Sequence, residues 1–77
     1  MWLLWVRFFI SMKLAVNGED KEIANGLSLD GLLEQLQIRP DRVVVELNRN
    51  IVSRDAYSTT MLVEGDKLEI VHFVGGG

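Results

Sequence analysis

The sequence predicts an α+β fold in which a mixed sheet of about four to five strands packs on one main helix. Two observations support this prediction. Strand-like apolar runs lie on both sides of a single amphipathic stretch, and tight-turn residues separate the runs. The chain has 77 residues, enough for one small domain. One helical stretch is too few for a doubly wound fold, and the strands are too few for a sandwich.

The first half of the domain is predicted to form a hairpin followed by the helix. Residues 12–16 alternate between apolar and polar or small side chains, and Asn17-Gly18 is a strong hairpin turn signal, so residues 21–24 should return as a second strand. Ser28 occupies an N-cap position, and the helix should run for about three turns and stop before Pro40. Leucines with helical spacing follow Ser28: Leu29, Leu32, Leu33 and Leu36.

The second half is predicted to add strands on the other side of the helix. Residues 43–48 are β-branched and almost continuously apolar, which predicts a central strand with neighbours on both edges. A short strand at residues 51–52 follows a tight turn, and Tyr57 should anchor the polar stretch 53–60 in the core. The last strand, residues 67–74, should place Leu68, Ile70 and His72 on one face and Glu69, Val71 and Phe73 on the other.

Residues 1–11 differ from the rest of the chain. They contain both tryptophans and two of the three phenylalanines, with no strand or helix periodicity. The stretch is too short to span a bilayer and lacks the charged region and cleavage site of a signal peptide. We expect an N-terminal extension outside the core domain of residues 12–74, and no membrane partner. The alternative is an aromatic segment that docks on a partner or on another copy.

Composition argues against several classes of function. The formal net charge is −3 and the basic residues do not cluster, so we expect no nucleic-acid partner. There is no Cys, hence no disulfide, thiolate nucleophile or thiolate metal site, which suits the cytoplasm. The single His, His72, has no carboxylates at metal-ligand spacing around it. We therefore expect neither catalytic residues nor a bound metal or cofactor.

The C-terminal stretch is the candidate functional feature. Gly75, Gly76 and Gly77 have no Cβ, so this tail could pass extended through a slot too narrow for side chains. If the helix covers one face of the sheet, Val71 and Phe73 lie on the open face just before the tail, with Val44 nearby. Such a patch suits docking of a modifying enzyme. Alternatively, Phe73 covers a sheet edge or meets the N-terminal segment, and the glycines are only a frayed end.

Several blocks of residues 12–77 resemble one family, the bacterial sulfur carrier proteins of thiamine biosynthesis known as ThiS. Their order and spacing are more specific than any single block. The blocks are Val16-Asn17-Gly18, residues 45–48 followed by Ile51-Val52 and Arg54, Gly65-Asp66 followed by residues 69–71, and residues 73–77. Residues 1–11 have no counterpart in the family pattern. The resemblance implies the ubiquitin-like β-grasp fold.

The resemblance also implies a carrier rather than an enzyme. In that family a ThiF-type enzyme uses ATP to adenylate the terminal glycine carboxylate, and a sulfur donor such as a cysteine desulfurase then supplies sulfur for a thiocarboxylate. Thiazole synthase takes this sulfur. Carried over, Gly77 bears the sulfur, Gly75 and Gly76 enter the partners' active sites, and the free carrier is a monomer. For His72, a strand position near the margin of the sheet is the favoured interpretation, and a role as proton shuttle for the thiocarboxylate is the less favoured one.

Two other functions remain open from the sequence. One is a carrier similar to the small subunit of molybdopterin synthase, which shares the fold and the tail. The other is a ubiquitin-like modifier or interaction module, whose tail would end in an isopeptide bond. The partner that co-purifies would separate the first from a thiamine carrier, and covalent ladders on cellular proteins would indicate the second.

Overall fold

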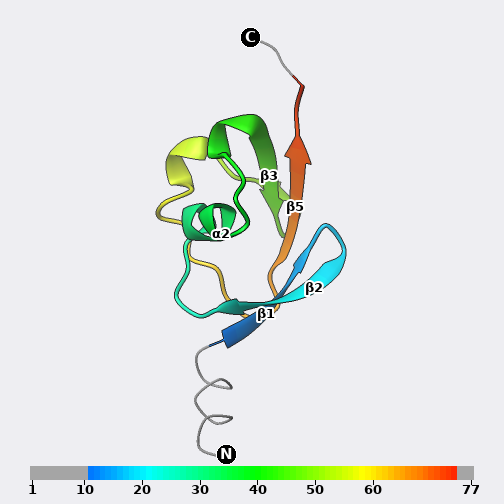
Figure 1. The fold of residues 1–77 in the computed structure, drawn as a ribbon, viewed down its shortest axis with the longest axis vertical. Coiled ribbons are helices and arrows are strands. Elements are labelled where there is room, and N and C mark those ends of the chain that lie inside the picture. The colour runs from blue at the N-terminus through cyan, green and yellow to red at the C-terminus, as the bar shows by residue number, and fades with distance from the viewer. Residues whose placement is uncertain (1–10, 75–77) are drawn as a thin grey trace, which may run out of the picture.

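The computed structural model describes residues 11–74 and shows a five-stranded mixed sheet with one α-helix on one of its faces (Figure 1). This arrangement confirms the predicted fold class. Two short 3-10 helices, at Pro40–Arg42 and Arg54–Ala56, lie in the connections. The strands and the helix are β1 (Ser11–Val16), β2 (Glu19–Ala24), α2 (Leu29–Gln35), β3 (Val43–Leu47), β4 (Asn50–Ile51) and β5 (Lys67–His72). Residues 1–10, and with them nearly all of the predicted extension, lie outside the described residues, as do Gly75, Gly76 and Gly77.

The sheet has the strand order β2-β1-β5-β3-β4, with β1 parallel to β5 and all other neighbours antiparallel. The middle strand is therefore β5. Our prediction that residues 43–48 form the central strand was right about neighbours on both edges and wrong about position, because β3 lies between β5 and the two-residue β4. The parallel pairing of the first strand with the last is a long-range feature that local pattern does not encode.

Two hairpin turns have the same left-handed geometry but different residues. Asn17 and Gly18 join β1 to β2 with φ values of 51° and 83°, as the Asn-Gly signal predicts. Asn48 and Arg49 join β3 to β4 with φ values of 50° and 73°. Asn tolerates this region, whereas Arg adopts it only at a cost in conformational energy. The second turn is therefore a strained version of the first.

The N-terminus of α2 is capped as predicted. The Ser28 Oγ accepts a hydrogen bond from the Gly31 N–H at 3.0 Å, which satisfies one of the free amides of the first turn. An added Cβ at Gly31 would lie 3.0 Å from Leu27 Cδ2. A larger residue here would require the Leu27 side chain to shift by a few tenths of an ångström, and glycine, although normally unfavourable inside a helix, avoids this contact.

The helix is shorter than we predicted. It ends at Gln35, after seven residues rather than about three turns. Gln37 has a φ of 60°, and its N–H donates to the Glu34 carbonyl at 3.0 Å, while the Ile38 N–H donates to the Leu33 carbonyl at 2.8 Å. These two bonds form a Schellman motif, in which a left-handed residue reverses the chain. Glycine usually occupies that position, so glutamine gave no signal in the sequence.

The core lies between α2 and the face of the sheet that the helix covers. Tyr57 is 4% exposed, which confirms its predicted role as an anchor. The buried apolar residues are Met12, Leu14, Val16, Ile23, Leu29, Leu32, Leu33, Val43, Val45, Tyr57, Leu62, Leu68 and Ile70. Alternate residues of each strand face away from this core, and no element of residues 11–74 covers this second, open face of the sheet.

A buried carboxylate fixes the start of β5. Asp66 is 8% exposed, and its two oxygens accept hydrogen bonds from the Asn48 side-chain amide at 3.0 Å and from the Val63 N–H at 2.9 Å. The Asn48 Oδ1 in turn accepts from the Lys67 N–H at 3.0 Å. This network joins the β3–β4 turn to the first residue of the middle strand. It leaves the carboxylate fully paired, as a buried polar group requires.

Candidate functional site

Two of the three predicted patch residues are direct neighbours on the open face of the sheet. Val44 on β3 and Val71 on β5 are register partners, and their exposed fractions are 41% and 57%. Directly opposite residues of an antiparallel pair have side chains in contact range on the same face. The structure therefore brings these two valines together, as the strand alternation indicated.

Phe73 extends the same surface toward the tail. It follows β5, and its N–H donates to the Arg42 carbonyl at 3.1 Å, so the ladder with the segment before β3 continues to this residue. Because strand residues alternate, Phe73 is on the same face as Val71, and it is 43% exposed. Below we call Val44, Val71 and Phe73 the apolar patch. Their placement on the open face agrees with the strand alternation, and their role as a docking surface stays a prediction.

Sequence reasoning missed one apolar residue beside the patch. Ile51 on β4 is 70% exposed and is the register partner of Glu46, so it lies on the open face at the outer strand. The short strand had been expected at residues 51–52, one residue late. Register through the Asn48-Arg49 turn would have placed Ile51 correctly, but arginine in a left-handed turn gives no sequence signal.

Two carboxylates border the patch on the open face. Glu46 and Glu69 are register partners on β3 and β5, one pair along the ladder from Val44 and Val71. Like charges directly opposite each other are destabilising in a sheet. The ion pairs found within residues 11–74 are Lys21 with Glu19 and Arg39 with Asp41, so neither Glu46 nor Glu69 is in one.

The strand that leads to the tail is held on both sides at its start. β3 pairs with β5 from Val43↔His72 to Leu47↔Leu68, and β1 pairs with it at Ala15 and Val16. Beyond β1, the Asn17 side chain continues the pairing. Its Oδ1 accepts from the Ile70 N–H at 2.7 Å, and its Nδ2 donates to the Ile70 carbonyl at 3.1 Å. The exit direction of β5 is thereby fixed up to Ile70.

His72 lies on the other face of β5 from the patch. It is exposed and lines a groove of about 330 Å³ between the β1–β2 hairpin, β5 and the segment after α2. The apolar part of the lining comes from Val16, Leu36, Ile38 and Ile70, and the polar part from Asn17, Glu19, Lys21 and His72. Within residues 11–74 the imidazole makes no hydrogen bond, and the interpretation of His72 as a proton shuttle gains no support from a partner side chain.

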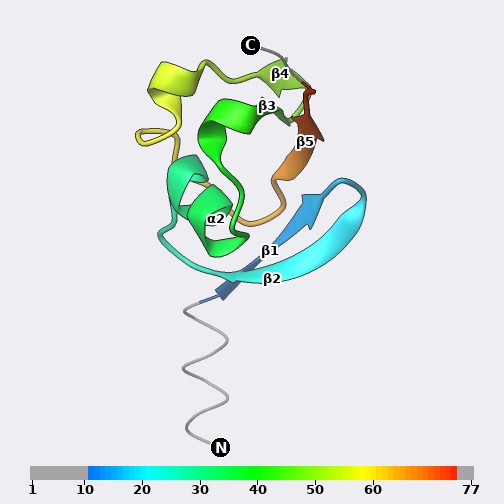
Figure 2. The same cartoon turned by 45° about the horizontal axis from the view of Figure 1, so that its top comes forward.

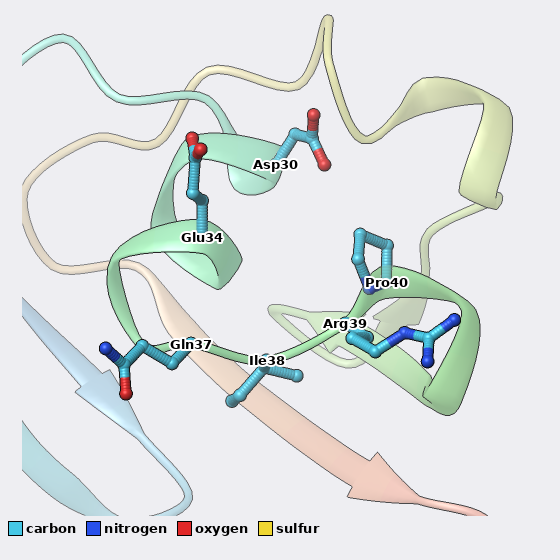
Figure 3. A pocket seen from close by; sticks show the side chains of 6 residues that line it. All are labelled: Asp30, Glu34, Gln37, Ile38, Arg39 and Pro40. Atoms are coloured by element: carbon cyan, nitrogen blue, oxygen red, sulfur yellow. The ribbon is translucent and has the colours of Figure 1, made fainter.

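A second hollow, of about 470 Å³, lies between α2 and the Pro40 turn (Figure 3). Asp30 and Glu34 project from the helix, while the Arg39 guanidinium turns away from them and donates to Asp41 at 2.9 and 3.2 Å. Gln37, Ile38 and Pro40 complete the lining. This set has no nucleophile beside a base, so it does not form the geometry of covalent or acid–base catalysis.

Within residues 11–74, no three His, Asp or Glu side chains are grouped in a way that could hold a metal ion. In the same range, no helix has both the length and the apolar character needed to cross a membrane.

Comparison with known proteins points to one family. The model of the ThiS family matches residues 14–77. A sulfur carrier protein ThiS of Bacillus subtilis is 37% identical over 65 residues, which is 83% of this chain and 98% of that protein. The crystal structure of a thiamine biosynthesis protein (ThiS) from Geobacter metallireducens superposes with a TM-score of 0.72 at 36% identity, covering 86% of this chain and 100% of the other.

A different kind of relative is much longer. A thiazole synthase of Magnetococcus marinus is 46% identical over 66 residues, which is 86% of this chain but 20% of that protein. The chain thus spans about a fifth of the length of the thiazole synthases that it matches. A segment similar to this chain is therefore part of some thiazole synthases.

Proposed function

We propose that this chain, which belongs to the ThiS family, is a sulfur carrier of thiamine biosynthesis that bears its sulfur on Gly77. The observation that carries the proposal is the family match, which runs through the glycine tail to Gly77. The fold agrees with it, because the middle strand of the sheet leads directly into that tail. The chain acts as a co-substrate of partner enzymes in the cytoplasm, and it is a monomer when free.

The chemistry requires an activating partner. A terminal carboxylate is ionised at neutral pH and is a poor electrophile, so its oxygen must become part of a leaving group before sulfur can replace it. A ThiF-type enzyme joins the Gly77 carboxylate to the adenylyl group of ATP, with release of pyrophosphate. The persulfide of a sulfur donor, such as a cysteine desulfurase, then attacks the acyl-adenylate, displaces AMP and forms an acyl disulfide. A thiol reductant supplies the two electrons that cleave the S–S bond and leave the thiocarboxylate.

Thiazole synthase is the proposed acceptor of this sulfur. Proteins named thiazole synthase contain a segment 46% and 41% identical to this chain, which supports a working contact between a carrier of this type and that enzyme. The same relatives favour thiamine biosynthesis over the molybdopterin pathway for this chain.

The apolar patch is the proposed docking surface for these partners. Val44, Val71 and Phe73 are partly exposed on the open face, and Phe73 is two residues from the glycine tail. A partner that covers the patch would hold the carrier while Gly75 and Gly76 pass into its active site. Glycines suit a narrow passage because they have no side chains.

The deciding experiment is an intact-mass measurement. The chain is incubated with ATP, a ThiF-type enzyme and a sulfur donor. We expect the intact chain to gain the mass that corresponds to exchange of one oxygen for one sulfur. After digestion, the same gain should be found on the peptide that contains Gly77. A chain that gains no mass, with an enzyme shown to load the Bacillus subtilis carrier, would contradict the proposal.

Three variants separate the roles of the tail and the fold. A chain without Gly77, a chain with one residue appended after Gly77, and Gly76→Phe should all fail to load. Their circular dichroism and their urea midpoints should match those of the unmodified chain. Normal loading of Gly76→Phe would refute the narrow passage, while leaving the carrier function intact.

A further inference from the structure

Among residues 11–74, nothing pairs with the C-terminal end of the β5 edge that faces β1. β5 extends beyond the tip of the β1–β2 hairpin, so the two strands lie side by side only at the start of β5 (Figures 1 and 2). In the described part of the chain, the last hydrogen-bonded contact on this edge is that of the Asn17 side chain with Ile70. Any hydrogen-bonding groups beyond Ile70 on this edge must find partners elsewhere.

The hydrogen bonds of neighbouring residues show to which edge of β5 each backbone N–H and C=O group points. The Leu68 carbonyl and the Ile70 N–H point toward β1, because they bond to Asn17, whereas the Phe73 N–H bonds to Arg42 before β3. Backbone groups of successive strand residues point to opposite edges. The N–H and the carbonyl of His72 therefore point to the β1 side, and within residues 11–74 neither has a partner.

The Asn17 side chain shows what this edge accepts. Its carboxamide presents one acceptor and one donor to Ile70 at 2.7 and 3.1 Å, and so takes the place of the C=O and the N–H that two peptide groups of a neighbouring strand would supply. His72 is two residues further along β5 and offers the same pair of groups with the same spacing. The chemically matching ligand is another amide, in an extended chain that continues where the Asn17 side chain stops.

We propose that an extended segment of the protein that takes up the tail pairs with the free edge of β5 at His72. This inference rests on the proposed function, because it assigns a further contact to the same partner. Strand addition uses main-chain hydrogen bonds for affinity and pockets for alternate side chains for specificity. The groove beside His72 supplies such a pocket, lined on its apolar side by Leu36, Ile38 and Ile70.

Pairing at this edge would fix how far the tail reaches. Gly77 is five residues beyond His72, so an extended tail would place its carboxylate about 16 Å from the paired residue, at about 3.3 Å per residue. A partner bound only to the flat apolar patch could slide along the sheet. A partner strand hydrogen-bonded to β5 could not, since a slip of its register by one residue would turn its side chains to the other face.

The test compares two substitutions of one residue. His72→Pro removes the N–H and places ring atoms where a partner strand would pair, while His72→Ala keeps the N–H. Both leave the β3 ladder intact, because the His72 backbone groups do not point to β3. With a ThiF-type enzyme that loads the unmodified chain, we expect His72→Pro to raise Kd at least tenfold and His72→Ala to raise it less than about threefold.

A second measurement needs no substitution. Hydrogen exchange of the His72 amide should slow when the enzyme binds, whereas the Val71 amide, which faces β3, should be slow in both states. In the His72→Pro chain, a protected Phe73 amide would verify that the bond to Arg42 is kept. Unchanged exchange of the His72 amide in the complex would overturn the proposal even if His72→Pro did not fold.

The other outcomes of the binding and loading assays distinguish strand pairing from the carrier function. Equal Kd values for His72→Pro and His72→Ala would refute strand pairing while loading of the unmodified chain still supported the carrier function. Failure of the unmodified chain to load would instead reject the proposed function. A dimer of the unmodified chain that His72→Pro disperses, with no change in enzyme affinity, would show that the edge pairs with a second copy.

Discussion

Truncation of Val71 gives a direct measure of docking through the apolar patch. Val71→Ala removes about two methylene equivalents, each worth about 0.8 kcal/mol when fully buried. Since 57% of the residue is exposed in the free chain, complete coverage by a partner makes about 0.9 kcal/mol depend on the missing atoms. We therefore expect Kd for the ThiF-type enzyme to rise about fivefold.

A second substitution, at Val44, the register partner of Val71, should weaken binding to the enzyme further. Val44 is 41% exposed, so Val44→Ala contributes about 0.7 kcal/mol by the same reasoning. The double variant should raise Kd about fifteenfold. Isothermal titration calorimetry of the enzyme without ATP measures this directly, and urea unfolding of each variant shows how much of the change comes from the fold.

The chain offers a matched control for this test. Val63 is also a valine, is 59% exposed, and lies before the turn whose Gly65 N–H donates to the Lys13 carbonyl. Because β1 runs parallel to β5, this position near the start of β1 is at the opposite end of the sheet from the tail. Val63→Ala should leave Kd unchanged. Equal losses for Val63→Ala and Val71→Ala would refute docking through the patch.

Four further predictions concern the fold. Arg49→Gly should raise the free energy of unfolding by about 0.5–1 kcal/mol, because glycine relieves a φ of 73°; a lower urea midpoint would contradict this reading of the turn. Gln37→Gly should stabilise by about 0.5 kcal/mol for the same reason at a φ of 60°, and a destabilised variant would mean that the glutamine side chain makes a necessary contact. Asn17→Ala should cost about 2 kcal/mol through two lost hydrogen bonds and should speed exchange of the Ile70 amide; unchanged exchange would argue against the side-chain pairing. Removal of residues 1–10, which leaves β1 complete, should preserve circular dichroism and sulfur loading, and loss of either would show that the segment belongs to the domain.

The order of the elements could be predicted because short-range signals mark most of their ends. Asn17-Gly18 marks the first hairpin, and Ser28 caps the helix as its position indicated. The end of the helix and the second hairpin were harder to predict, because Gln37 and Arg49 adopt left-handed angles that their residue types do not favour. Next to these residues, Asn48 bonds to Asp66 and Lys67, and Ile38 packs against the core, and neither contact can be predicted from a local pattern.

The faces on which the patch residues lie could be predicted from the sequence, but the pairing between strands could not. Alternation along residues 67–74 was enough to place Val71 and Phe73 on one face, and β-branched composition suggested that Val44 was near. The direct pairing of Val44 with Val71 depends on the register between β3 and β5, and residues 48–66 separate these strands in the sequence, so no turn signal sets that register. The free edge at His72 depends on where β1 stops alongside β5, which is a property of the assembled sheet alone.

The middle position of β5 explains why one strand can carry both the patch and the tail. β3 holds one edge along the whole strand, and β1 with the Asn17 side chain holds the other edge as far as Ile70. The direction in which the chain leaves the sheet is therefore set by the core and is the same in every carrier molecule. A partner docked on the apolar patch, as we propose, would then find the strand that precedes the tail at a fixed place. Loosening of the β3–β5 ladder should accordingly slow loading even when the glycines and the apolar patch are unchanged.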